Sequence, residues 1–237
     1  MYKKLTVLLL LGCYAVTGNG LAQTKAGVDF ANAYIFRGVT VNDSYVMQPC
    51  LDVTAYGGKL NMGVWGNYSF DNYGGSDNAN QFSELDLYGS YTVPVGPSSL
   101  SFKYTEYTYP TSDSDADREL GIGSGITAAG ISWSGSIYYG IDGSIDGATY
   151  IEFGASRAFD LTDKLMLNAG ATLAYLNQIG GQDGFSNFTA GLQLSYAWLS
   201  AGITYIGQID DDVLTDSRDG SGYDINTLVT VGVSHSF

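Results

Sequence analysis

The chain has 237 residues, of which 45% are hydrophobic and only 14% are charged, and its formal net charge at pH 7 is −14. So acidic a chain is a poor partner for nucleic acid, because binding to phosphates needs clustered Lys and Arg. Its two cysteines, Cys13 and Cys50, exclude a small secreted fold held together by several disulfides.

The amino-terminal 22 residues have the pattern of a signal peptide. Lys3 and Lys4 precede an apolar run over residues 5–16, and Gly20-Leu21-Ala22 supplies the small residues that signal peptidase requires. We expect cleavage after Ala22, so that residues 1–22 are removed and residues 23–237 form one mature domain. The mature chain then has eight basic and 24 acidic residues, a formal charge of −16.

A second interpretation of this leader stays open. Leu10-Leu11-Gly12-Cys13 resembles a lipoprotein cleavage box, which would leave Cys13 as a lipidated first residue, although Leu11 is bulky for such a box. The apolar run is shorter than the roughly 20 residues that a membrane-spanning helix needs, and no later stretch approaches that length. Helical membrane proteins are therefore excluded.

The mature chain divides into segments of about ten residues in which apolar and polar residues alternate, as in tilted strands that cross an outer membrane. Twelve such strands are expected, at residues 26–38, 45–56, 59–70, 81–93, 99–109, 118–127, 131–142, 149–158, 164–176, 186–196, 199–208 and 226–237. In the third strand Leu60, Met62 and Val64 face one way, and this apolar face should contact lipid. Asn32 falls on the lipid face of the first strand, which indicates a bulge or a change of register.

The connections alternate in length along the chain, as they do in outer-membrane barrels with short periplasmic turns and longer external loops. Short links are expected at residues 57–58, 94–98, 128–130, 159–163 and 197–198, and longer ones at 39–44, 71–80, 110–117, 143–148, 177–185 and 209–225. An even number of strands places both termini in the periplasm. The terminal Phe237 resembles the carboxy-terminal signal by which bacterial outer-membrane proteins are recognised for insertion.

Lumen-facing residues should carry the function of a barrel of this size. By alternation they include Asp29, Arg37, Gln48, Asp52, Asn67, Glu84, Asp86, Lys103, Glu152, Asn168, Thr172 and Gln193. We expect Gln48, Asn67 and Glu84 at similar height, with Arg37 near the outer end of the same wall. Such charges place a transverse field across a constriction that sorts solutes, or they form a polar network that satisfies itself and plugs the barrel. The sequence leaves both readings open.

Metal binding and catalysis are not expected. Two acidic groups, Asp113 with Asp115 and Asp117, and residues 210–212 with Asp216, Asp219 and Asp224, are interpreted as solvated loops rather than as calcium sites, because their spacing does not match the ordered calcium loop. The one histidine, His235, lies near the carboxyl end on the face assigned to lipid, which is a poor place for a general base. We therefore predict no catalytic residue, no cofactor and no metal.

Three segments near the start of the mature chain carry a family resemblance: residues 29–40 (DFANAYIFRGVT), 63–68 (GVWGNY) and 84–91 (ELDLYGSY). They resemble the opening strands of the TorF family of outer-membrane porins, over the first third of the mature chain. The resemblance implies a barrel with a transport role, and it transfers no catalytic residue. It implies that Arg37 lies at a lumen-facing rim position, followed by a sharp turn at Gly38.

Together these features predict an all-β chain that folds as a single antiparallel, up-and-down transmembrane β-barrel in the outer membrane of a Gram-negative bacterium. The first hypothesis is a porin, a narrow passive channel for small hydrophilic solutes or ions, whose partners are outer-membrane lipid, lipopolysaccharide and the outer-membrane assembly machinery. The second is a non-conducting structural or adhesive barrel whose acidic external loops bind a partner. The third is a soluble secreted barrel in which the apolar face is a packed core.

Overall fold

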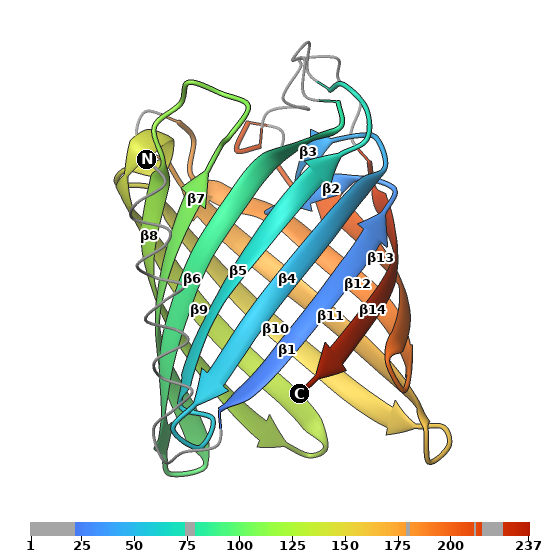
Figure 1. Cartoon of the computed structure of the whole chain (residues 1–237). Helices are drawn as coiled ribbons and strands as arrows, with labels where there is room; N and C mark the ends of the chain where they lie inside the picture. The colour runs from blue at the N-terminus through green and yellow to red at the C-terminus, as the bar shows by residue number, and fades with distance from the viewer. Residues whose placement is uncertain (1–21, 74–78, 179–180, 211, 215–224) are drawn as a thin grey trace.

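The computed structural model describes residues 22–73, 79–178, 181–210, 212–214 and 225–237. Twelve strands form a closed antiparallel barrel (Figure 1). They are β1 (Gln23–Ala31), β4 (Val46–Ala55), β5 (Leu60–Ser69), β6 (Gln81–Val95), β7 (Ser98–Thr108), β8 (Asp117–Ala128), β9 (Ile131–Asp142), β10 (Thr149–Asp160), β11 (Leu165–Asn177), β12 (Gly184–Tyr196), β13 (Leu199–Gln208) and β14 (Thr227–Ser236). The predicted fold class is confirmed. Residues 1–21 of the predicted signal peptide, and Asp211, Asp216, Asp219 and Asp224 of the predicted acidic loop, lie outside the described residues.

Pairing between the first and last strands closes the barrel. In β1 and β14, Lys25 lies opposite Ser236 and Phe30 lies opposite Val231. Each of the other ten barrel strands pairs with its two neighbours, so the described wall of the barrel has no edge strand that could pair with another chain. Among the described residues, no helix is long and apolar enough to cross a membrane.

The apolar face of the strands points outward. In β8, Leu120 and Ile122 are 50% and 52% exposed, whereas Glu119, which alternates with them, is buried. Phe153 and Leu192 repeat this pattern on β10 and β12. A soluble barrel with this face as its core would bury these side chains, whereas a lipid-facing band requires them outside.

The two ends of the barrel differ in their connections. Short turns join β6 to β7, β8 to β9 and β12 to β13, and they lie with the carboxyl terminus at one end, while the longer connections lie at the other (Figure 1). Ala129 and Gly130, which join β8 to β9, both have positive φ, as a two-residue hairpin turn requires. At the opposite end a single turn of 3-10 helix, Gly143–Ile145, interrupts one of the longer links.

The prediction of one strand over residues 26–38 is wrong. β1 ends at Ala31, and the chain then forms a separate two-stranded sheet of β2 (Tyr34–Phe36) and β3 (Val39–Asn42) before it rejoins the wall in β4. The residues expected as an external loop after this strand therefore belong partly to a hairpin. Residues 33–36 (Ala-Tyr-Ile-Phe) are all apolar, so the alternation of the wall strands breaks directly after Asn32. The predicted strand extends through this run.

Asn32 marks the point at which the chain leaves the wall. Its backbone N–H donates to the carbonyl of Val229 at 3.3 Å. Its side-chain amide accepts from the Val229 N–H at 2.7 Å and donates to the Thr227 carbonyl at 3.0 Å. The side chain thus replaces the missing continuation of β1 and satisfies the backbone of β14, which explains a polar residue on the outward face.

Candidate functional site: a hairpin across the lumen

A tight turn forms the tip of the β2–β3 hairpin. Arg37 and Gly38 have φ angles of 51° and 87°. A type I′ turn requires a positive φ at both central residues, and glycine is often the second of them. A Cβ atom on Gly38 would lie 2.7 Å from Cβ of Asn187, so only glycine fits where the tip meets β12. The predicted sharp turn at Gly38 is therefore observed, inside a hairpin rather than after a wall strand.

The base of the hairpin is fastened to β5 and β6. The Tyr34 ring packs against Trp65 with a centroid distance of 5.4 Å, and its hydroxyl donates to Glu84 Oε1 at 3.1 Å. Burial, reinforced by the neighbouring Glu84 carboxylate, raises the pKa of the Tyr34 hydroxyl, so it stays a donor. Asn42 of β3 donates from its side chain to Ser69 Oγ at 2.9 Å.

The tip of the hairpin is fastened to the opposite wall. Arg37 Nη2 donates to both carboxylate oxygens of Glu119 at 2.9 Å, and the Glu119 side chain is only 3% exposed. Tyr107 donates its hydroxyl to the same carboxylate at 2.8 Å. The Arg37 guanidinium also lies 4.4 Å from the ring centroid of Tyr150 and 5.0 Å from that of Tyr138, within range of cation–π attraction.

Contacts to strands on several sides of the barrel place the hairpin inside it. The wall strands that it touches include β5 and β6 at its base and β7, β8, β9 and β10 at its tip. The carbonyl of Gly38 also accepts from Gln208 Nε2 of β13 at 3.1 Å. A segment that bridges strands around most of the circumference lies across the lumen, at the end where the long connections gather (Figure 1).

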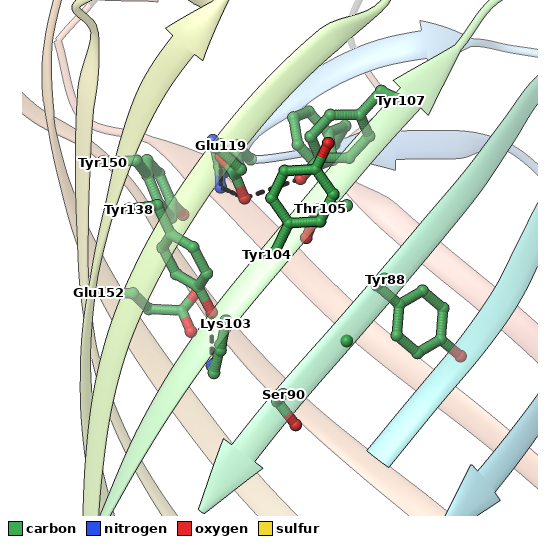
Figure 2. Close-up of a pocket in the computed structure, with 13 residues that line it drawn as sticks. Tyr88, Ser90, Lys103, Tyr104, Thr105, Tyr107, Glu119, Tyr138, Tyr150 and Glu152 are labelled. Carbon is green, nitrogen blue, oxygen red and sulfur yellow. Dashed lines mark hydrogen bonds and ion pairs between the residues drawn. The ribbon is translucent and has the colours of Figure 1, made fainter. Parts of the chain in front are cut away.

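A cavity of about 440 Å³ adjoins the tip of the hairpin. Charged and aromatic side chains line it: Phe36, Arg37, Tyr88, Lys103, Tyr104, Tyr107, Glu119, Tyr138, Tyr150 and Glu152, with smaller residues between them. Figure 2 shows Lys103, Tyr138 and Glu152 close together, with Tyr88 and Ser90 on β6, the strand next to that of Lys103. The hairpin therefore narrows the lumen without filling it.

The remaining lumen on the β9–β14 side is lined by small neutral groups. A second cavity, of about 410 Å³, is bordered by hydroxyl, amide and glycine positions that include Ser134, Asn168, Thr172, Thr189 and Gln193. Thr172 and Thr189 share a hydrogen bond of 2.7 Å across β11 and β12. This part of the wall offers hydrogen bonds to a solute but no net charge.

Other predicted lumen residues lie on β4 and β5, at the base of the hairpin, or at the first cavity. Gln48 donates to Asn67 Oδ1 at 3.0 Å, and Asp52 accepts from the Tyr88 hydroxyl at 2.7 Å. Glu84 and Asp86 are buried near the base of the hairpin, at 6% and 9% exposure. Asp86 Oδ1 has no hydrogen-bond partner among the described residues. Lys103 and Glu152 lie at the cavity.

Arg37 is not where it was predicted. The expectation that it shares the wall of Gln48, Asn67 and Glu84 is wrong, because the hairpin carries it across the lumen to Glu119 on β8. Glu119 and the tyrosines of β7, β9 and β10 were not among the predicted residues. The one local indication was the alternation in β8, where Glu119 shares a face with Gly121 and Gly123 and the other face is apolar.

Carboxylates outnumber cations on the inward face. Cross-strand register and alternation place on it Asp29, Asp52, Glu84, Asp86, Asp117, Glu119, Glu152 and Asp160, against Lys25 and Lys103, and the hairpin adds Arg37. These are eight acids and three bases among the described residues, a formal excess of five negative charges. The outward charges Glu106, Arg118 and Asp142 instead pair with one another near the hairpin end of the barrel.

Several solved structures share this fold. A KdgM porin is 9% identical, with a TM-score of 0.55 over 91% of this chain and 99% of the other. A KdgM porin in complex with disordered oligogalacturonate is 8% identical, with a TM-score of 0.54 and the same coverage. The COG4313 outer membrane channel from Pseudomonas putida F1 is 11% identical, with a TM-score of 0.51 over 91% of this chain and 96% of the other. At such identities the likeness establishes the fold alone.

Sequence comparison gives a family without a known role. Residues 15–237 match the family described as "Bacterial protein of unknown function (Gcw_chp)". No curated protein matches the sequence closely enough to count as a relative. The likeness to outer-membrane porin folds agrees with what the TorF resemblance implied, while the TorF name itself stays a prediction.

Proposed function

The chain belongs to the Gcw_chp family of bacterial proteins of unknown function, and from its geometry we propose that it is a narrow passive channel for small hydrophilic solutes in the outer membrane. The observation that carries this proposal is the β2–β3 hairpin. It crosses the lumen and is held at both ends, yet a cavity of about 440 Å³ remains beside its tip and another of about 410 Å³ lies along β9 to β14. A lumen narrowed by a fixed polar segment is the arrangement by which pores sort solutes by size and charge.

The charge of the lumen supports a preference for cations and neutral solutes. An excess of inward carboxylates raises the local concentration of cations and repels anions, most strongly at low ionic strength. One structure of similar fold was determined with oligogalacturonate, an acidic sugar chain. The acidic lumen of the present chain argues against a polyanion of that kind as its solute.

The outward face and the predicted leader support a location in the outer membrane. A band of exposed apolar side chains around a closed barrel suits contact with outer-membrane lipid and lipopolysaccharide. Residues 1–22 would direct export as a signal peptide, and Phe237, which is 75% exposed, would serve as the insertion signal for the assembly machinery. The lipidated alternative at Cys13 belongs to the same compartment.

A non-conducting barrel is the second candidate, and the contacts of the hairpin are the observation that favours it. If the hairpin and the connections above it close the lumen fully, the molecule would act through its external loops as a structural or adhesive protein. The described acidic residues of those loops include Asp113 and Asp115, which are exposed. This candidate predicts folded, inserted protein that carries no current.

The native cysteine offers a direct test of conduction through the lumen. Cys50 shares the inward face with Gln48 and Asp52, is partly exposed, and is the one cysteine of the mature chain. We expect a charged methanethiosulfonate reagent to reduce the single-channel conductance of the native protein in a planar bilayer. Cys50→Ser should conduct and be insensitive to the reagent. Current that the reagent leaves unchanged after verified modification would mean that ions do not pass through this lumen.

A further inference from the structure

Lys103 reaches into the cavity beside the hairpin with an unneutralised charge. Its ammonium donates to the Tyr138 hydroxyl at 2.8 Å and to Ser136 Oγ at 3.4 Å. Gly123 on the intervening strand makes room for Ser136 Oγ, which a Cβ there would approach to 2.9 Å. Both partners are neutral, and an ammonium has three hydrogens to donate. One donor and the full positive charge thus remain available to a solute.

Glu152 presents the opposite charge on the same part of the wall. It lines the cavity and lies directly across β9–β10 from Ser136, the residue to which Lys103 donates. The ion pairs that the described residues form involve Arg37, Glu119, Arg118, Glu106 and Asp142, and neither Lys103 nor Glu152 is among them. The Lys103 side chain thus spans β8 to bring its ammonium to Ser136 on β9, and Glu152 lies on the adjacent strand β10, about one strand spacing of 5 Å from Ser136.

The nearby Arg37–Glu119 pair does not compete for a charged solute. Its two groups already bind each other, and Glu119 also accepts from Tyr107. The rest of the cavity wall is aromatic, with Tyr88, Tyr138 and Tyr150 around it. A volume of about 440 Å³ falls within the range of small-molecule sites.

We propose that this cavity is a binding subsite for a small zwitterion of amino-acid size, whose carboxylate contacts Lys103 and whose ammonium contacts Glu152. The inference rests on the proposed channel function and specifies its solute class. A zwitterion satisfies both charges of the wall at once, whereas an inorganic ion satisfies one and a neutral sugar satisfies neither. Each charge-assisted hydrogen bond is stronger than a neutral one, which favours the zwitterion over a sugar of equal size.

The test is saturation-transfer NMR on the refolded protein in detergent, with L-alanine as the probe. L-alanine should bind, and propionate, ethylammonium and glucose should each bind at least about tenfold more weakly, a difference of about 1.4 kcal/mol. Lys103→Met and Glu152→Gln should each weaken the binding of L-alanine by a similar factor. Glu106→Gln, which changes an outward carboxylate, should leave the affinity unchanged.

The exchanged variant Lys103→Glu/Glu152→Lys separates binding from damage to the fold, since it keeps both charges and should regain most of the affinity lost in the single variants. Glucose binding as tightly as L-alanine, or single variants that bind L-alanine normally, would overturn the proposal. Because this measurement needs no current, binding by a protein that does not conduct would refute the channel and keep the subsite. Conduction without L-alanine binding would refute the subsite and keep the channel.

Discussion

Asn32 shows how one side chain lets a strand leave the barrel without exposing backbone. Its amide makes two hydrogen bonds to β14, to Thr227 and Val229. Asn32→Ala should therefore lower the free energy of unfolding by about 2 kcal/mol, about 1 kcal/mol for each bond. Urea unfolding in lipid vesicles measures this loss. Asn61→Ala, which removes a single side-chain bond to Thr54, is the control and should cost less. Equal losses would contradict the role assigned to Asn32.

Glu119 holds the tip of the hairpin through one charge. Glu119→Gln keeps the shape of the side chain but leaves the Arg37 guanidinium, which is 19% exposed, without its anion. We expect the tip to be less firmly held by about 2 kcal/mol, the worth of a hydrogen bond between charged groups. Single-channel recordings should then show larger current fluctuations and a higher mean conductance. Glu106→Gln, which removes an outward partner of Arg118, should show neither change. Identical recordings for both variants would mean that the ion pair does not restrain the hairpin.

At the level of the elements, the wall strands were predictable and the hairpin was not. A wall strand separates lipid from a wet lumen, so its two faces differ chemically and the period of two is visible in the sequence. In β2 the alternation is absent: Tyr34, Ile35 and Phe36 are all apolar, and Tyr34 and Phe36 bury aromatic rings against Trp65 and Tyr107 inside the barrel. The break in alternation is visible in the sequence, but an apolar run does not by itself tell an aromatic interior from a lipid face. The turn at Gly38 was predictable since glycine permits its positive φ.

The partner of Arg37 illustrates why the site was only partly predictable. Arg37 and Glu119 are 82 positions apart in sequence, and they meet because the hairpin crosses the lumen. Alternation predicts that residues such as Gln48 and Asn67 share the inward face. It therefore predicts contacts between adjacent strands of the wall. Contacts across the lumen depend on the path of the hairpin, which alternation does not determine.

For the whole molecule, the excess of inward carboxylates predicts selectivity. Asp29 and Asp52 lie on the inward face of β1 and β4, and Asp29→Asn/Asp52→Asn removes two of the negative charges. The preference for K⁺ over Cl⁻, read from the reversal potential in a KCl gradient near 0.01 M where the screening length is about 30 Å, should fall. Asp113→Asn/Asp115→Asn removes the same charge from an exposed loop and serves as the control. A larger effect from the loop variant would place the selective charges outside the lumen.

The most direct test of the central claim compares the conductance of the native protein with that of a variant without the hairpin. Ala31 and Val46 are cross-strand partners of β1 and β4, so a two-residue Asn-Gly turn can replace residues 32–45 and leave the wall register unchanged. Heat-dependent migration on gels verifies that the variant forms a barrel. If the hairpin narrows an open lumen, the native protein conducts and the variant conducts several times more. Equal conductance in the two proteins, or no conductance from either when folded and inserted, would contradict the claim that the hairpin narrows an open lumen.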